Sequence, residues 1–230
     1  MKHIITFLLA ITIAFTASAQ RNVTKFLGIP VDGTKSAMIQ KLKAKGFMYD
    51  ATNDVLTGEF NGHDVNLHVV TNSNKVYRIM VVDAVGSSEG DIKIRFNTLC
   101  KQFEKNGKYV PQNFIKGEYS IGEDVDLSYE IGVNEKRFEA AYYQFTEADQ
   151  DTTGLTEWAI DKITEKYGLE KWQNMSEEEA QQEQLMLGVE YLMKKISHKS
   201  VWFMISKSWG VYRIIMYYDN GLNQANGEDL

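Results

Sequence analysis

The sequence predicts an α+β fold in which antiparallel sheet is covered by helices on one face. Its β-like runs alternate apolar and polar side chains, which is typical of antiparallel sheet with one covered face. Helix-like stretches with an apolar stripe precede these runs, and the order of elements recurs about every 60 residues. Together these observations predict tandem α-β-β-β modules.

The repeat is visible in short blocks that return in the same order. Leu-Thr-Gly-Glu-Phe at 56–60 returns as Ile-Lys-Gly-Glu-Tyr at 115–119, and Asp-Val-Asn-Leu at 64–67 returns as Asp-Val-Asp-Leu at 124–127. Val-Tyr-Arg-Ile at 76–79 returns at 211–214 in a third, shortened copy. We therefore expect repeats at 20–86 and 87–147, a modified α-α-β-β repeat at 148–219, and a flexible tail at 220–230.

Residues 1–19 have the form of a secretory signal peptide. Lys2 gives a positive start, residues 4–15 are apolar, and Ala17-Ser18-Ala19 forms a cleavage site before Gln20. The apolar run is too short to span a bilayer, so we expect no membrane insertion. Because the junction has no cysteine, we expect no lipid anchor. We therefore expect the protein to be periplasmic or secreted.

In the first module, Thr34 or Ser36 can cap a helix that ends near Gly46. The second module opens with a clearer helix, because Ile92, Phe96, Leu99 and Phe103 form one apolar stripe. Three short β-like runs are expected after each helix, separated by turn residues.

The third module has two predicted helices, at 153–167 and 176–197. Ser176 and Glu179 match a capping box at the start of the second helix. Two strands are expected to follow, near 199–206 and 210–218. Ser208-Trp209-Gly210 between them is typical of a hairpin tip, which would expose Trp209.

Composition narrows the classes of partner and chemistry. The formal charge is −6 and basic residues form no run, so we expect no nucleic-acid partner. The single cysteine, Cys100, excludes an intramolecular disulfide and lies beside the apolar stripe of a helix, where a buried thiol is expected. No metal or cofactor motif is present, so we expect neither.

The polar side of the predicted sheet is the candidate binding surface. Arg and Trp are typical anchors of interfaces, and carboxylates add specificity. An ordinary solvated sheet with cross-strand ion pairs explains many of the same residues. The candidate ligand- or partner-binding residues are Arg78, His68, Asp126, Glu130, Glu139, Trp202, Trp209 and Arg213.

Repeated carboxylates suggest an alternative, a hydrolase of the envelope that uses Glu59, Glu118, Asp124 or Asp126. Against it, catalysis needs unequal roles for an acid and a base, whereas residues that recur in every copy usually serve the structure of the copies. No nucleophile motif is present. We therefore expect a non-catalytic protein.

The segment Val-Asp-Gly-Thr-Lys-Ser-Ala-Met-Ile-Gln-Lys-Leu at 31–42 resembles the opening of two related families. These are the β-lactamase-inhibitor-like modules and the small outer-membrane-assembly lipoproteins. The resemblance implies helices against a short antiparallel sheet, in tandem in the inhibitors. The chain lacks the lipid-attachment cysteine of the lipoproteins and the paired disulfides of the inhibitors. It also resembles exported tandem-repeat proteins of gut-type Gram-negative bacteria that have no assigned function.

The sequence therefore predicts an exported, non-catalytic binding protein whose exposed sheet face engages a protein or an envelope glycan. An envelope-assembly scaffold without a small ligand is a further alternative. Neither the binding-protein hypothesis nor the scaffold hypothesis identifies the partner.

Overall fold

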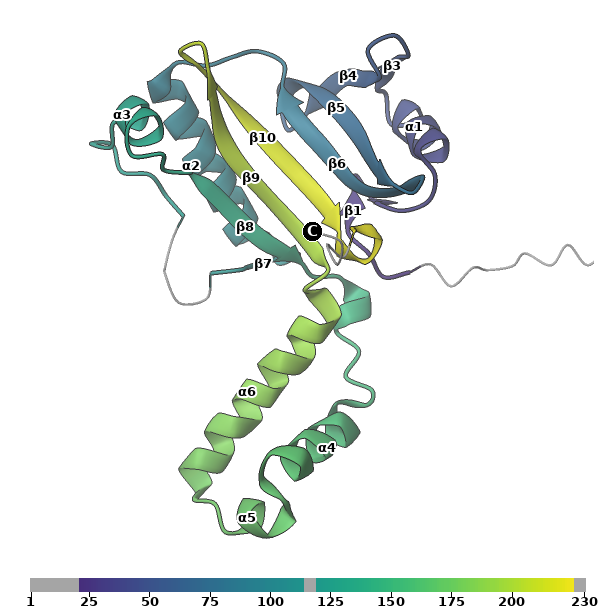
Figure 1. Ribbon diagram of the computed structural model, residues 1–230, viewed down its shortest axis with the longest axis vertical. Coiled ribbons are helices and arrows are strands. Elements are labelled where there is room, and N and C mark those ends of the chain that lie inside the picture. Colours follow the sequence, from purple (N-terminus) through teal and green to yellow (C-terminus); the bar gives the residue numbers. More distant parts are fainter. Residues whose placement is uncertain (1–20, 114–118, 226–230) are drawn as a thin grey trace, which may run out of the picture.

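The computed structural model describes residues 21–113 and 119–225 and has an α+β fold, as the sequence predicts (Figure 1). One antiparallel sheet of eight strands has the order β3-β4-β5-β6-β10-β9-β8-β7, and β1 and β2 form a separate ribbon. The strands are β1 Lys25–Phe26, β2 Ile29–Pro30, β3 Met48–Asp50, β4 Val55–Phe60, β5 His63–Asn72, β6 Lys75–Asp83, β7 Tyr109–Pro111, β8 Glu139–Gln144, β9 Lys199–Ser208 and β10 Val211–Asn220. The helices are α1 Lys35–Lys43, α2 Glu89–Lys105, α3 Leu127–Gly132, α4 Leu155–Tyr167, α5 Leu169–Gln173 and α6 Glu177–Ile196, with 3-10 turns η1 Glu147–Asp149 and η2 Gly221–Asn223.

Helices α1 and α2 each begin at a side-chain cap, and for α1 it is Thr34, one of the two predicted candidates. The hydroxyl of Thr34 accepts a hydrogen bond from the Ala37 amide at the start of α1, and Ser88 accepts one from Asp91 at the start of α2. Both helices bury one apolar side. In α2 this side contains the predicted stripe of Ile92, Phe96, Leu99 and Phe103.

The core lies between these helices and one face of the sheet. Alternation along the strands is as predicted, because Ile79 and Val81 of β6 are buried whereas Arg78, Met80 and Val82 are partly exposed. Aromatic rings join the two layers: the ring centroids of Phe96 on α2 and Phe203 on β9 are 5.2 Å apart. The second face of the sheet carries the partly exposed side chains.

Strands β9 and β10, from the predicted third module, occupy the middle of the sheet. Strand β10 pairs with β6, and β9 pairs with β8. Strands that are distant in the sequence therefore share one continuous sheet. A site on the central strands combines residues of β6 with residues of β9 and β10.

The expected strand across residues 124–130 is wrong. Asp126 instead caps α3, because its carboxylate accepts a hydrogen bond from the Tyr129 amide at 2.8 Å. Leu127 of this short helix is buried, and its amide donates to Glu89 at the start of α2. Another strand expected in this module, at 115–119, falls almost entirely outside the described residues, which include only Tyr119, whereas the third is present as β8.

The two predicted helices of the third module, together with the short α5 between them, form an arm that projects from the sheet between β8 and β9 (Figure 1). The capping box of Ser176 and Glu179 is present at the start of α6, as predicted. At the base of the arm, Lys199 and Asp149 form an ion pair whose side chains are both 0% exposed. Burial lowers the pKa of Lys199, although its hydrogen bond to Asp149 acts in the opposite direction.

The expectation of a frayed tail from residue 220 onward is wrong for the residues that the structure describes. Asn220 is 0% exposed, and its side-chain amide donates to the Val31 carbonyl. Asn223 of η2 donates to the Val76 carbonyl and to Asp32. These amides satisfy backbone and side-chain acceptors inside the fold. Residues 226–230 lie outside the described part of the chain.

The predicted signal peptide also lies outside the described residues. Among the described helices, none combines the length and the apolar character that crossing a membrane would need.

Candidate functional site

One face of the large sheet is open. Helices α1 and α2 lie against the opposite face, and the arm extends away from the sheet, so none of the described helices covers this side (Figure 1). We call this surface the open face. It consists of the outward side chains of β5, β6, β10, β9 and β8, namely Asn66, His68, Val70, Arg78, Met80, Val82, Arg213, Ile215, Tyr217, Asp219, Ser200, Trp202, Met204, Glu139, Ala141 and Tyr143.

The strand register arranges these side chains in rows across the sheet. One row runs through His68, Met80, Tyr217, Trp202 and Ala141. The next row on one side runs through Val70, Arg78, Asp219, Ser200 and Tyr143, and the next on the other side through Asn66, Val82, Ile215, Met204 and Glu139. The aromatic side chains of Tyr217 and Trp202 therefore lie next to Arg78 on the central strands.

Arg78 and Asp219 form the polar centre of the open face. The guanidinium donates from Nε to Oδ1 at 2.6 Å and from Nη2 to Oδ2 at 2.7 Å. The indole Nε1 of Trp202 donates to the same Oδ2 at 3.0 Å. The Asp219 side chain is only 6% exposed, whereas that of Arg78 is 25% exposed. The buried Asp219 carboxylate therefore fixes the positions of the Arg78 and Trp202 side chains.

Tyr217 packs beside both Arg78 and Trp202. Its ring stacks on that of Trp202 with centroids 4.0 Å apart and an interplanar angle of 18°. The Arg78 guanidinium carbon lies 4.7 Å from the centroid of the Tyr217 ring. We call the group of Arg78, Tyr217, Trp202 and Asp219 the stacked cluster.

Charge in the stacked cluster is fixed across the neutral pH range. The hydrogen bonds from Arg78 to Asp219 raise the pKa of the guanidinium, which stays protonated. Burial raises the pKa of the Tyr217 hydroxyl, so this group stays neutral. The cluster therefore offers a surface of mixed polarity, with a charged guanidinium beside a neutral phenol.

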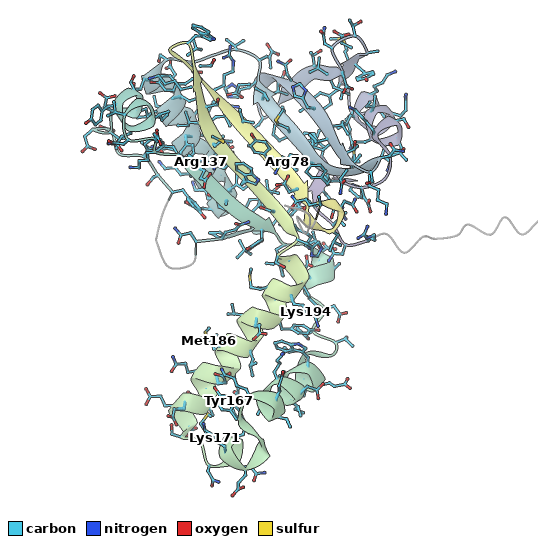
Figure 2. The ribbon with its side chains drawn as sticks, in the orientation of Figure 1. Arg78, Arg137, Tyr167, Lys171, Met186 and Lys194 are labelled. Carbon is cyan, nitrogen blue, oxygen red and sulfur yellow. The ribbon has the colours of Figure 1, made fainter. Side chains whose placement is uncertain are left out.

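The structure brings five of the eight predicted residues onto the open face. Arg78 and Trp202 meet in the stacked cluster, and His68 lies in the row of Trp202. Glu139 pairs with Arg137 at 2.7 Å near the edge of the face, where Figure 2 labels Arg137. Arg213 lies farther along β10, toward the β9–β10 hairpin.

The other three predicted residues lie elsewhere. Trp209 is 100% exposed at the tip of the β9–β10 hairpin, as its turn sequence predicts, but it lies beyond the rows of the open face. Placing Asp126 and Glu130 on this face is wrong, because both belong to the α3 region. Glu130 pairs with Lys136 at 3.6 Å and accepts from Asn134 at 3.1 Å.

Sequence reasoning missed two members of the stacked cluster as site residues. Tyr217 shares the alternation of Arg213 on β10, so its place on this face was predictable. Asp219 follows in the same alternation at the end of the strand. Its importance depends on Arg78, which is 141 residues away in the chain, and no local pattern indicates that pairing.

A groove lies on the helix-covered side. Two cavities, of about 380 and 810 Å³, share Leu27, Phe60, Asn106, Tyr109 and Tyr218 in their linings and therefore join. Burial raises the pKa of Tyr109 and holds that of Tyr218 well above its usual value, so the phenols here are neutral. Sequence reasoning did not indicate this groove.

The groove gives little support to the hydrolase alternative. Of the carboxylates named from the sequence, Glu59 lines the smaller cavity, and the other carboxylate in the described lining of the groove is Glu147 in the larger cavity. Glu59 lies opposite Asp64 in the β4–β5 hairpin, which is the turn environment favoured from the sequence. Asp126 is engaged as a helix cap, and Glu118 lies outside the described residues.

The described residues also form no metal-binding cluster and contain no exposed thiol. Within the described ranges, no group of three or more His, Cys, Asp or Glu side chains could hold a metal ion. Cys100 is buried, and burial raises the pKa of its thiol to about 12, so the thiolate is disfavoured.

Comparison with known proteins adds no family. The chain matches no protein-family model, no curated protein and no solved structure. The open face and its stacked cluster therefore carry the functional argument.

Proposed function

We propose that this chain is an exported, non-catalytic binding protein whose open face engages a partner protein. The observation that carries this proposal is the stacked cluster. Trp, Tyr and Arg are the residues that most often dominate the binding energy of protein interfaces. Here all three lie together, with Arg78 and Trp202 bonded to a buried carboxylate, on a face that no described helix covers.

The surroundings of the cluster fit the same role. Met80, Val82, Met204 and Ile215 are partly exposed on the open face around the stack. An apolar surround with a charged rim, here Arg137 and Glu139, resembles the anatomy of a protein interface. Because Asp219 already orients Arg78 and Trp202, a partner meets side chains that need little further ordering.

A glycan is the second candidate partner, and the surroundings of the stack favour it less. Sugar rings stack on the exposed face of an aromatic ring. The guanidinium carbon of Arg78 lies 4.7 Å from the Tyr217 centroid and 5.6 Å from the Trp202 centroid, so it sits beside the stacked pair and does not cover the outer face of Tyr217. A sugar would use the ring faces, whereas a protein can also use the ring edges and the apolar surround.

Capture with a matched pair of variants tests the proposal. The chain from residue 20 onward, immobilised on beads, is exposed to envelope and culture-medium fractions of the source cells. Trp202→Ala removes an anchor of the stacked cluster, whereas Trp209→Ala removes a more exposed tryptophan at the hairpin tip. We expect a protein that the wild type and Trp209→Ala retain and that Trp202→Ala loses.

Two further binding measurements complete the test. The retained protein, once purified, should bind with at least 10-fold lower affinity to Trp202→Ala and Arg78→Ala than to the wild type. A glycan array probed with the same proteins distinguishes the second candidate. Equal retention by wild type and Trp202→Ala contradicts the proposal.

A further inference from the structure

The groove on the helix-covered side has the size of a small-molecule site. Its two joined cavities, of about 380 and 810 Å³, fall within the range of roughly 300–1,000 Å³ that is typical of ligand pockets. The turn between β1 and β2, helix α2 and the η1 turn all contribute to its lining, and Phe60, Phe103, Tyr109 and Tyr218 add aromatic rings. The groove can therefore hold the apolar body of a small organic molecule.

The two cavities differ in charge. Lys25 and Lys108 line the larger cavity with one carboxylate, that of Glu147, so positive charge is in excess there. In the described part of the chain, neither lysine has an ion-pair partner. The charged side chain in the described lining of the smaller cavity is Glu59. An anionic group is therefore favoured in the larger cavity and disfavoured in the smaller one.

Backbone hydrogen bonds attach both lysines to the end of β8. The Lys25 amide donates to the side chain of Gln144 at 2.7 Å, and the same side chain donates to the Lys25 carbonyl at 3.0 Å. The amide of Phe145, the next residue, donates to the Lys108 carbonyl at 2.7 Å. The two lysines therefore start from neighbouring points of the fold, which gives the groove one cationic end.

Leu27 lines both cavities from an unfavourable backbone conformation. Leu27 and Gly28 join β1 to β2, and their φ angles are 50° and 80°. A two-residue turn with positive φ at both positions favours Asn followed by Gly. Leucine rarely adopts such a φ, and its side chain is still 38% exposed beside the groove. Strained residues of this kind gather at ligand-binding sites, so Leu27 indicates an apolar ligand.

We propose that the groove binds an amphipathic organic anion, namely a carboxylate with a long alkyl chain. The carboxylate lies between Lys25 and Lys108, and the alkyl chain runs past Leu27 and the aromatic rings into the smaller cavity. Glu59 would repel the carboxylate in the reverse orientation. An elongated ligand suits two joined cavities with charge at one end. The groove and the open face lie on opposite sides of the sheet, so the proposal does not depend on partner binding at the open face.

Isothermal titration calorimetry with dodecanoate, below its micelle-forming concentration, tests the class of ligand. The chain from residue 20 onward should bind dodecanoate saturably. It should bind dodecyltrimethylammonium, which has the same tail and the opposite charge, about 10-fold more weakly. Decanoate has two methylenes fewer and should also bind about 10-fold more weakly than dodecanoate. No saturable binding of dodecanoate, or equal affinity for the two dodecyl ions, overturns the proposal.

Charge variants locate the carboxylate. Lys25→Gln combined with Lys108→Gln should weaken dodecanoate binding about 10-fold and abolish the preference over dodecyltrimethylammonium. The matched control is Lys45→Gln combined with Lys75→Gln, which removes the same charge at two exposed positions outside the described lining of the groove. This control should bind dodecanoate as the wild type does. Equal affinities of the two double variants contradict the proposal.

The variant Leu27→Asn separates binding from folding. Asparagine suits the turn, so the variant should stay folded, with a Tm within about 3 °C of the wild type. It should nevertheless bind dodecanoate about 5-fold more weakly, because the alkyl chain loses an apolar contact. The control Leu185→Asn changes a leucine of α6 that is 69% exposed, and it should keep wild-type affinity. Unchanged affinity in Leu27→Asn overturns the proposed position of the ligand.

Discussion

Arg78 on β6 and Asp219 on β10 form a two-point ion pair that organises the open face. The two residues are 141 positions apart in the sequence, and the carboxylate that joins them is 6% exposed. The same carboxylate accepts the indole hydrogen of Trp202. This one buried acid therefore connects β6 to β9 and β10.

Replacing Asp219 with Asn should destabilise the fold by about 2–3 kcal/mol, because Arg78 then loses a charged partner on a largely buried site. Urea unfolding followed by circular dichroism measures this change. The control is Glu139→Gln, which breaks the exposed pair with Arg137 and should cost less than about 0.5 kcal/mol. Equal stability of Asp219→Asn and wild type would show that the ion pair does not organise the face.

The buried pair of Asp149 and Lys199 should make stability depend on pH in the acid range. Burial alone would raise the pKa of Asp149, but hydrogen bonds from Lys199 and Thr146 outweigh it and lower that pKa. A carboxyl whose pKa is lower in the folded state stabilises the fold above the unfolded value of about 3.9. That contribution is lost as the pH falls through the folded value.

Urea unfolding of the wild type between pH 7 and pH 2 should therefore show a steep loss of stability below about pH 4. Asp149→Ala should be destabilised by about 3–5 kcal/mol at pH 7, because it leaves Lys199 buried without a counter-charge. The double variant Asp149→Leu with Lys199→Met should recover much of that loss and show a shallower acid dependence. An unchanged acid dependence in the double variant refutes this role of the pair.

The hairpin tip offers a separate test at Trp209. Its φ is 52°, in the left-handed region that favours Asn and Gly, and Gly210 follows with a φ of 74°. Since the Trp209 side chain is 100% exposed, Trp209→Asn should raise Tm by about 2 °C. Gly210→Ala should instead lower stability by about 1 kcal/mol. A fall in Tm for Trp209→Asn would mean that the indole packs against something.

The arm should be separable from the sheet. Asp151 and Lys195 are hydrogen-bonded at its base, so a short Gly-Ser linker can replace residues 153–194. The shortened chain should lose helical circular dichroism yet unfold in one cooperative transition, because the core under α1 and α2 remains. Loss of cooperative unfolding would show that the arm contributes to the core.

Local patterns predicted most elements because each carries its own signal. Thr34, Ser176 and the stripe from Ile92 to Phe103 determine helices within a few residues of sequence. The segment at 124–130 failed because its apolar alternation also suits a short helix, and Asp126 acts as a cap. In the tail, the polarity of Asn220 and Asn223 gave no sign of the distant carbonyls that their amides bind.

The candidate site was predictable in part for a related reason. Alternation of side chains along each strand places Arg78, Trp202 and Tyr217 on the same face of the sheet. Their contact depends on β6 pairing with β10, which is set by the packing of the whole chain. Strand pairing at this range is not encoded in any local pattern.

Photo-cross-linking from the open face tests the central claim most directly. A benzoyl-phenylalanine placed at Met204, beside the stacked cluster, is compared in living cells with one at Ile94, which is exposed on the opposite layer. Binding through the open face predicts a discrete adduct with another protein from position 204 and none from position 94. An adduct from position 94 alone, or no adduct from position 204, would contradict it.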